Sequence, residues 1–330
     1  MRVLFNTYPW AFATPGGGEI QLLKYAEHLP TLGVEVELHN IWKPAFDRVD
    51  MVHFFACLGG SIQFCSYAKS RGLPLVISTS LWITEDTTHR YPMDEIRAQL
   101  SLADLIITNS DTESDVLSRV FGLPRENFVA VMNGVEPHFS APHDPALFRA
   151  RYGIEGPFVL NVGNVEARKN QLNLVRAMKG HELPVVVIGH VREPEYGRQV
   201  IEEGGAQLRY LGPLDHTDPL LASAYAACAA FVLPSTLETP GLAALEAAAA
   251  GAPLVVTSEG STRDYFGSMA HYIRHDDLAD IRRGIDAALS AGPNGDLKAH
   301  IRQNFAWATV TRTLADIYAR VLAARAPGAS

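Results

Sequence analysis

Short β-rich segments alternate with helical ones along nearly the whole chain. Most of these segments end in a turn and are followed by a helical pattern, as from Glu19 to Leu29. Strands that alternate with helices form parallel sheets, so the chain is predicted to be an α/β protein with two doubly wound, Rossmann-like domains. The segments are "RVLFNTY", "VEVELHN", "MVHFF", "PLVISTS" and "LIITNS" in the first half, and "FVLNVG", "PVVVIG", "QLRYLG", "AFVLPS" and "PLVVTS" in the second.

Length and composition indicate two domains. A chain of 330 residues suits two domains of about 150 residues each. The region 133–157 is rich in Pro, Gly and His and lies where the first series of strands stops, so we expect the linker there. The predicted domains are 1–150 and 151–306, followed by a helix over about 307–325. Ligands of open parallel sheets bind at the carboxyl ends of the strands, so the domains are expected to face each other across a ligand-binding cleft.

Charge and cysteine content exclude several classes of function. The net charge of −8 disfavours nucleic acid as a partner, since nucleic-acid binding needs a basic surface. No apolar run approaches the roughly 20 residues of a membrane helix. Three cysteines form neither a CxxC pair nor a Cys/His cluster, so we expect buried thiols rather than disulfides or zinc ligands. The expected location is the cytoplasm, with peripheral contact at the inner face of the membrane as one option.

A glycine-rich loop follows the first predicted strand. It reads "TPGGGEI" from Thr14 to Ile20 and opens the first helix. Gly17 and Gly18 let the backbone approach an anion closely, and the amides at a helix start favour negative charge. The loop matches neither GxGxxG nor the Walker pattern, so a phosphate site and a plain flexible turn both remain open.

A second loop, "NVGNVEARKNQ", carries two adjacent cations. A buried strand ends at Gly163, and a helix is expected to start near Lys169 or Asn170. Arg168 and Lys169 would lie at the positive end of that helix, where each is disfavoured by about 0.3 to 1 kcal/mol. Either an anion such as a diphosphate offsets this charge, or the two side chains are simply solvated.

A third loop places two carboxylates on either side of a helix start. Thr239 is a good N-cap and Pro240 suits the first helical position, so we predict a helix from Pro240 to Ala250. Glu238 lies just before this helix and Glu246 about two turns into it. Because the rest of the helix is mostly alanine, it is expected to pack tightly rather than to expose a polar face.

The order of groups in this third loop suits one kind of ligand. The amides of Gly241 and Leu242 lie between two hydrogen-bond acceptors, Glu238 and Glu246. A ligand with hydroxyl groups at both ends and a diphosphate in the middle fits this order, and that is the description of a nucleotide sugar. Carboxylates near phosphate are repulsive, so cations must compensate, and Arg168 and Lys169 are the candidates.

Taken together, these segments resemble glycosyltransferase family 4, the retaining enzymes of the GT-B fold that use nucleotide sugars. The resemblance covers nearly the whole chain. The Glu-x7-Glu motif is weak by itself, but it is strong in this order with the RKN loop. In this family the last helix commonly packs back on the N-terminal domain. The matching segments are "PGGGE", "ADLIITNSDTESDVL", "VMNGVEPHF", "VGNVEARKNQ", "YLGPL", "AAFVLPSTLETPGLAALEAAAAGAPLVVTSEGSTRDYFG" and "WATVTRTLADIYARVL".

The resemblance implies roles for individual residues. Glu238 would face the transferred sugar, and Glu246 would bind the ribose hydroxyls. Arg168 and Lys169 would hold the diphosphate and stabilise the leaving nucleoside diphosphate; with Glu238 they form the expected catalytic set. Gly17 and Gly18 would approach the phosphates from the other domain, and the region around Gly189 and Tyr210 would border the base. The remaining predicted substrate contacts are Gly163, His190, Thr239, Gly241 and Leu242.

Two positions depart from the family pattern. Many relatives have a histidine after the fourth strand, where this chain has Ser80; Ser80 is the expected acceptor-side contact. The common "EGFG" is "ETPG" here, so Pro240 has no amide to offer the sugar. Three residues close after Ser80 could contact the acceptor or could be ordinary loop residues: Glu85, Asp86 and His89.

The expected function is a retaining glycosyltransferase that moves a sugar from a nucleotide-diphosphate sugar to a hydroxyl of a glycan or lipid-linked acceptor, as in bacterial polysaccharide or lipopolysaccharide assembly. The chain has no DxD triplet, in agreement with the metal-independent chemistry that the resemblance implies. The alternatives are an inactive nucleotide-sugar-binding subunit and a nucleotide-sugar epimerase on the same fold. The base, the sugar, the acceptor and the oligomeric state stay open.

Overall fold

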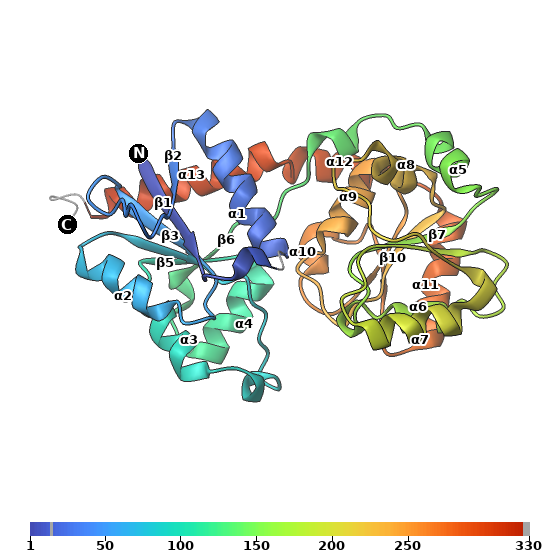
Figure 1. The fold of residues 1–330 in the computed structure, drawn as a ribbon, viewed down its shortest axis with the longest axis horizontal. Coiled ribbons are helices and arrows are strands. Elements are labelled where there is room, and N and C mark those ends of the chain that lie inside the picture. Colours follow the sequence, from blue (N-terminus) through green and yellow to red (C-terminus); the bar gives the residue numbers. More distant parts are fainter. Residues whose placement is uncertain (14–15, 326–330) are drawn as a thin grey trace. The chain divides into compact units, whose positions relative to one another are not determined.

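The chain folds into two compact units, Met1–Gly134 with Trp307–Ser330, and Val135–Ala306. The computed structural model describes residues 1–13 and 16–325. Each unit has a six-stranded, wholly parallel sheet with helices packed around it (Figure 1). The predicted α/β class with two doubly wound sheets is therefore confirmed. None of the described helices is both long and apolar enough to cross a membrane.

The first unit has the strand order β2-β1-β3-β4-β5-β6. Its strands are β1 (Arg2–Thr7), β2 (Glu35–Leu38), β3 (Met51–Phe55), β4 (Leu75–Ser78), β5 (Leu105–Thr108) and β6 (Phe128–Ala130). Its helices are α1 (Gly17–His28), α2 (Ile62–Ser70), α3 (Met93–Leu100), α4 (Asp111–Phe121) and α13 (Trp307–Ala323).

Both faces of this first sheet are buried. Successive residues of β1 point to opposite faces, so Phe5 packs with α1 and α13 while Leu4 packs with α2 and α3. Tyr25 of α1 meets Trp307 of α13 edge-on, with ring centroids 5.8 Å apart. The last helix is therefore an integral part of the first unit.

A carboxyl group is buried inside the first unit. Glu113, at the start of α4, is 1% exposed and accepts hydrogen bonds from the Thr79 hydroxyl (2.7 Å) and the Asn109 amide (2.8 Å). Burial raises the pKa of Glu113 to about 7, because these hydrogen bonds only partly offset the loss of solvation. Glu113 is therefore protonated in the folded state over a pH range in which the unfolded chain ionises it.

This raised pKa predicts a pH dependence of stability. A raised carboxyl pKa stabilises the fold below the unfolded pKa, and the contribution is lost as pH rises toward 7. The Glu113→Gln variant copies the protonated acid, so its stability relative to the native protein should improve by up to about 3 kcal/mol between pH 4.5 and 7.5. Urea unfolding at a series of pH values measures this difference. The exposed Glu126→Gln serves as control, and a difference that does not vary with pH would contradict the prediction.

The second unit has the strand order β12-β11-β10-β7-β8-β9. Its strands are β7 (Val159–Val162), β8 (Val185–Ile188), β9 (Leu208–Tyr210), β10 (Ala230–Leu233), β11 (Leu254–Thr257) and β12 (His271–Ile273). Its helices are α5 (Pro145–Tyr152), α6 (Gln171–Ala177), α7 (Pro194–Gly204), α8 (Pro219–Ala227), α9 (Leu242–Ala250), α10 (Thr262–Phe266), α11 (Leu278–Ala291) and α12 (Gly295–Asn304).

The boundary between the units differs from the one predicted. The first unit ends at Gly134 rather than at residue 150, because the following segment packs on the second unit. Val135 pairs with Ala306 in an isolated parallel bridge, and α5 packs against α8. The region 133–157 is thus mostly an ordered part of the second unit, although its Pro- and Gly-rich composition resembles that of a linker.

The ten predicted strand segments all contain strands, and the structure adds β6 and β12. Both additional strands are only three residues long and lie at sheet edges. A strand of three residues presents too few positions for a reliable alternating or continuous apolar pattern. The equally short β9 was predicted, so length alone does not account for the difference.

Candidate functional site

The two loops with the strongest chemical character follow neighbouring strands in the second unit. The chain runs outward from β7 through β8 to β9, then returns to place β10 on the other side of β7. The order of strands therefore reverses between β7 and β10. Ligands of open α/β sheets bind outside the carboxyl ends of the strands at such a reversal. The loop after β7 contains Arg168 and Lys169, and the loop after β10 contains Glu238.

Lys169 and Glu238 form an ion pair at this position. Lys169 Nζ lies 2.6 Å from Glu238 Oε1, and the side chains are only 14% and 5% exposed, respectively. Burial alone would raise the pKa of Glu238, but the charges of Lys169 and Arg168 outweigh it and hold the pKa below its usual range. Glu238 is accordingly ionised at neutral pH and can act as a hydrogen-bond acceptor.

Arg168 connects the same pair to a second carboxylate. Its guanidinium lies 3.7 Å from Glu238 Oε1 and 3.2 Å from Glu166 Oε1. Half of the Arg168 side chain is exposed, whereas Glu166 and Glu238 are buried. The sequence leaves open whether an anion offsets these cations or the two side chains are solvated, and two carboxylates of the chain itself lie there. Arg168 keeps an exposed surface through which it can meet a ligand.

Backbone contacts hold the two loops together. A 3-10 turn covers Ala167–Lys169, and Asn170 then takes a left-handed conformation (φ 59°) before α6 begins at Gln171. The Asn170 side-chain amide donates to the carbonyl oxygens of Pro234 (2.9 Å) and His275 (2.8 Å). The Thr236 amide donates to the Arg168 carbonyl at 2.9 Å. The cations are therefore placed by the fold rather than by flexible side chains alone.

Glu238 is fixed from the opposite side by the loop after β11. It forms a parallel bridge with Gly260, and the Ser261 amide donates to its carbonyl oxygen at 3.0 Å. Gly260 has φ 96°, and a Cβ added there would lie 2.1 Å from that same oxygen. Only glycine fits this contact, so Gly260 is a requirement of the site that sequence spacing did not reveal.

The helix after Glu238 begins later than predicted. Gly241, not Thr239, caps α9, and Leu242 rather than Pro240 is its first residue. Gly241 has φ 82°, a left-handed conformation that a right-handed helix cannot include. Among the described residues, no group accepts a hydrogen bond from the amides of Gly241, Leu242 and Ala243. This helix start therefore presents its amides two residues after the Pro240 position.

Glu246 lies in a separate cluster farther along α9. It is 6% exposed, and its Oε2 accepts a hydrogen bond from the Tyr225 hydroxyl at 2.7 Å. Burial raises the pKa of Tyr225 well above its ordinary value, so the tyrosine stays protonated and donates. His216 Nε2 lies 2.8 Å from Oε1, and the His216 side chain is 43% exposed. Neither partner was predicted, although Tyr225 is the one large polar side chain in an alanine-rich stretch.

The predicted base-side residues also lie close together. Gly189 approaches Gly163 so closely that a Cβ at Gly189 would lie 2.0 Å from the Gly163 carbonyl oxygen. The Tyr210 hydroxyl donates to the Gly189 carbonyl at 2.8 Å, and the Val165 amide donates to that of His190 at 2.8 Å. The loops after β7, β8 and β9 are thus joined at one edge of the sheet.

Three predicted residues lie in the first unit. Gly17 is the first residue of α1, and a Cβ on Gly18 would lie 2.9 Å from the Ser80 hydroxyl oxygen. Ser80 is exposed and has φ 46°, which is uncommon for a residue other than glycine. Thr14 and Pro15 of the predicted loop lie outside the described residues. Within the described part of the chain, the exposed residues Glu85, Asp86 and His89 form no hydrogen bond or ion pair with Ser80; the Asp86 carboxylate accepts a hydrogen bond from the Thr84 hydroxyl.

Most of the second unit matches a known family model. Residues 147–304 match the model described as glycosyl transferases group 1. This range contains Arg168, Lys169, Glu238 and Glu246, the residues that the geometry singles out. The match covers slightly less than half of the chain.

Relatives of known name support the same class. D-inositol 3-phosphate glycosyltransferase 1 of Catenulispora acidiphila is 28% identical over 305 residues, 84% of this chain and 66% of the relative. O-antigen chain mannosyltransferase B of Escherichia coli is 29% identical over 230 residues, 65% of this chain and 55% of the relative. The chain thus spans about half to two thirds of the length of these relatives.

Solved structures show the same fold over the whole chain. Sucrose-phosphate synthase from Thermosynechococcus elongatus superimposes with a TM-score of 0.81 at 19% identity, covering 98% of this chain and 99% of that one. Anabaena HepE in complex with UDP gives 0.78 at 18% identity, covering 97% and 100%. The fold is GT-B. Together with this fold, the family match over residues 147–304 and the named relatives support the glycosyltransferase superfamily.

Proposed function

We propose that this protein is a retaining glycosyltransferase of family 4 that moves a sugar from a nucleotide-diphosphate sugar to an acceptor hydroxyl. One observation carries the proposal: at the strand-order reversal of the second unit, Arg168 and Lys169 converge on buried Glu238 beside the open amides of α9. Cations, helix amides and a carboxylate are the groups that a sugar diphosphate requires.

Each group has a part in the proposed reaction. The diphosphate lies between the amides at the start of α9 and the cations Arg168 and Lys169, which stabilise the charge that develops on the leaving group. Glu238 accepts hydrogen bonds from hydroxyls of the transferred sugar. Glu246, held by Tyr225, accepts from the ribose hydroxyls. Arg168, Lys169 and the start of α9 supply the positive charge that the diphosphate needs, so we propose that transfer needs no metal.

Retention follows if the acceptor hydroxyl attacks on the face from which the diphosphate departs. The glycosidic bond to the phosphate oxygen breaks, the bond to the acceptor oxygen forms, and the acceptor proton passes to the leaving phosphate oxygen. Arg168 and Lys169 act on that same oxygen. Stabilising one departing group by a few preorganised charges is worth about 10² to 10³ in rate.

The names of the relatives suggest the biological setting. The Escherichia coli relative is an O-antigen chain mannosyltransferase, and the Anabaena neighbour was crystallised with UDP-glucose. We propose a role in bacterial polysaccharide or lipopolysaccharide assembly with a glycan or lipid-linked acceptor. The three free cysteines are buried thiols, as suits a cytoplasmic enzyme that meets its acceptor at the inner face of the membrane.

A thermal-shift panel of UDP-, GDP- and dTDP-sugars tests the proposal. A donor at 100 times its dissociation constant should add about 2.7 kcal/mol to the stability of the second unit. One base should stand out from the others, and the matching donor should be hydrolysed slowly in water. Binding without transfer to any acceptor would favour an inactive binding subunit, interconversion of the donor sugar would favour an epimerase, and no shift with any donor would overturn the proposal.

A further inference from the structure

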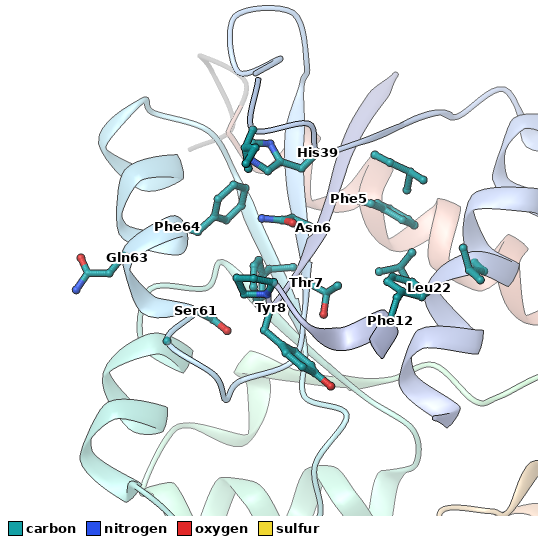
Figure 2. A pocket seen from close by; sticks show the side chains of 16 residues that line it. Phe5, Asn6, Thr7, Tyr8, Phe12, Leu22, His39, Ser61, Gln63 and Phe64 are labelled. Carbon is teal, nitrogen blue, oxygen red and sulfur yellow. The ribbon is translucent and has the colours of Figure 1, made fainter. Parts of the chain in front are cut away.

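A cavity of about 770 Å³ opens in the first unit, apart from the residues considered above. The strand order of this unit reverses between β1 and β3, and residues after both strands line the cavity: Tyr8 and Pro9 after β1, Gly60 and Ser61 after β3. Figure 2 shows its side chains gathered around the carboxyl end of β1. The cavity therefore lies where ligands bind in open parallel sheets.

Apolar side chains line the cavity both in its buried part and at its rim. Phe5 and Leu22 from one face of the sheet and Phe54 from the other are at most 3% exposed. Phe12 is 48% exposed and Ile41 is 72% exposed, and both lie at its rim. Exposed apolar side chains around a hollow are unfavourable in water and become favourable when a ligand covers them. The volume is typical of a site for one small organic molecule.

The polar side chains of the cavity are uncharged: Asn6, Thr7, Tyr8, His39, Ser61 and Gln63. None of the described lining residues is Asp, Glu, Lys or Arg. The His39 ring packs edge-on against Phe64, with centroids 4.9 Å apart, and burial lowers the pKa of His39, so the ring is neutral at physiological pH. His39 Nδ1 is buried with no hydrogen-bond partner among the described residues. The cavity thus offers apolar surface with several uncharged hydrogen-bonding groups, and no cationic side chain that would hold a phosphate.

The cavity is linked to the glycine-rich helix start of the same unit. Tyr8 lines the cavity, and its hydroxyl lies 3.2 Å from Glu19 Oε1 of α1. The other oxygen of Glu19 accepts from the Gly16 amide at 2.7 Å. Gly18 in turn lies against Ser80, the predicted acceptor-side residue. One short chain of contacts therefore joins the cavity to the residues at which the acceptor is expected.

We propose that this cavity binds the uncharged, apolar part of the acceptor, an alkyl or aryl group a few carbons long, and leaves the hydroxyl group of that molecule outside the cavity for transfer. The inference rests on the proposed function and narrows its acceptor to an amphiphile. A pyrophosphate group next to the cavity would need cations that the described lining lacks. A wholly polar acceptor would bring no alkyl or aryl group to cover the exposed side chains of Phe12 and Ile41.

Direct binding gives the first test. N-phenyl-1-naphthylamine is neutral and fluoresces in apolar sites, and it should bind the native protein at one saturable site without any nucleotide. The double variant Phe12→Ser, Ile41→Ser should weaken this binding at least about fivefold, because it removes two apolar contacts. The matched control is Trp42→Ser, since Trp42 is 86% exposed but does not line the cavity. Absence of saturable binding, or equal loss in the control, would overturn the inference.

Transfer gives the second test. Methyl and hexyl glycosides of glucose, galactose and mannose are compared as acceptors below their micelle concentrations. The hexyl member of at least one pair should have a kcat/KM at least about tenfold higher, and the double variant should abolish this preference. The inference would be overturned if the methyl and hexyl members of every pair were turned over equally, or if no glycoside were turned over at all. Slow donor hydrolysis should be unchanged in the Trp42→Ser control.

The two tests separate this inference from the proposed function. If no nucleotide sugar shifts the melting temperature but the naphthylamine binds, the proposed function fails and the cavity remains a binding site. If donors bind and the naphthylamine does not, the inference alone fails. Cosedimentation with phosphatidylcholine vesicles that is lost equally in the double variant and in Trp42→Ser would identify a membrane contact instead.

Discussion

Replacing Lys169 with methionine is expected to lower kcat for sugar transfer by about 10² to 10³-fold. The ammonium group lies 2.6 Å from buried Glu238, at the strand reversal where we place the diphosphate. Methionine keeps much of the length and removes the charge that stabilises the leaving group. Steady-state release of nucleoside diphosphate measures the effect. Lys179→Met is the matched control, because Lys179 pairs with Glu203 on the surface and should leave kcat unchanged.

The same substitution also removes the partner of a buried carboxylate. Breaking such a pair costs about 3 to 5 kcal/mol, because Glu238 would remain buried without compensation. The double variant Lys169→Met, Glu238→Gln lacks both charges and should regain most of that stability. Its affinity for the nucleoside diphosphate that best stabilises the native protein should stay low, whereas Glu238→Gln alone should bind it normally. Native affinity in the double variant would show that Lys169 serves only to neutralise Glu238.

The Gly260→Ala variant is expected to lose about 3 kcal/mol or more of stability and most of its affinity for the donor. A Cβ at this position would lie 2.1 Å from the Glu238 carbonyl oxygen, in a backbone conformation with φ 96°. Backbone cannot move aside as a flexible side chain can, so the bridge between Gly260 and Glu238 must open. Glu238 would then leave its place beside Lys169. Chemical unfolding and donor titration measure the two effects.

Gly267→Ala is the matched control for this variant. Gly267 also has a positive φ, 54°, but a Cβ there would meet nothing within 4 Å. Its substitution should cost only the backbone strain, about 1 to 2 kcal/mol, and leave donor affinity unchanged. Equal losses in the two variants would contradict a specific role for Gly260.

Much of the fold followed from local pattern. The segments that became β7 and β10, "FVLNVG" and "AFVLPS", are buried strands flanked by turn residues, and such strands need long apolar runs wherever helices cover both faces of a sheet. The boundary between the two units was harder to predict from the sequence. The segment after Gly134 looks like a linker by composition, yet Val135 pairs with Ala306 from the far end of the unit, a contact separated by more than half of the chain.

Part of the site was also readable from the residues. Adjacent cations before a helix, and carboxylates on either side of a helix start, have few explanations in so apolar a context, so Arg168, Lys169, Glu238 and Glu246 could be singled out. The hydrogen-bond partners of these residues could not be predicted from the sequence. Tyr225 meets Glu246 because α8 packs on α9, and His216 meets it from the loop before α8; no spacing along the chain encodes these contacts.

Residue type and order along the chain were enough for the class of fold, for the strands other than β6 and β12, and for the charged residues of the candidate site, because hydrophobic period, turn chemistry and charge act locally. Which strands become neighbours depends on contacts between residues far apart in sequence. Only that pairing placed β7 beside β10 and so joined Lys169 to Glu238. The tertiary structure also decided that the helix begins at Leu242 rather than at Pro240, because Gly241 takes a left-handed backbone conformation in the folded chain. The cavity at the end of β1 likewise exists only once the side chains around it are packed.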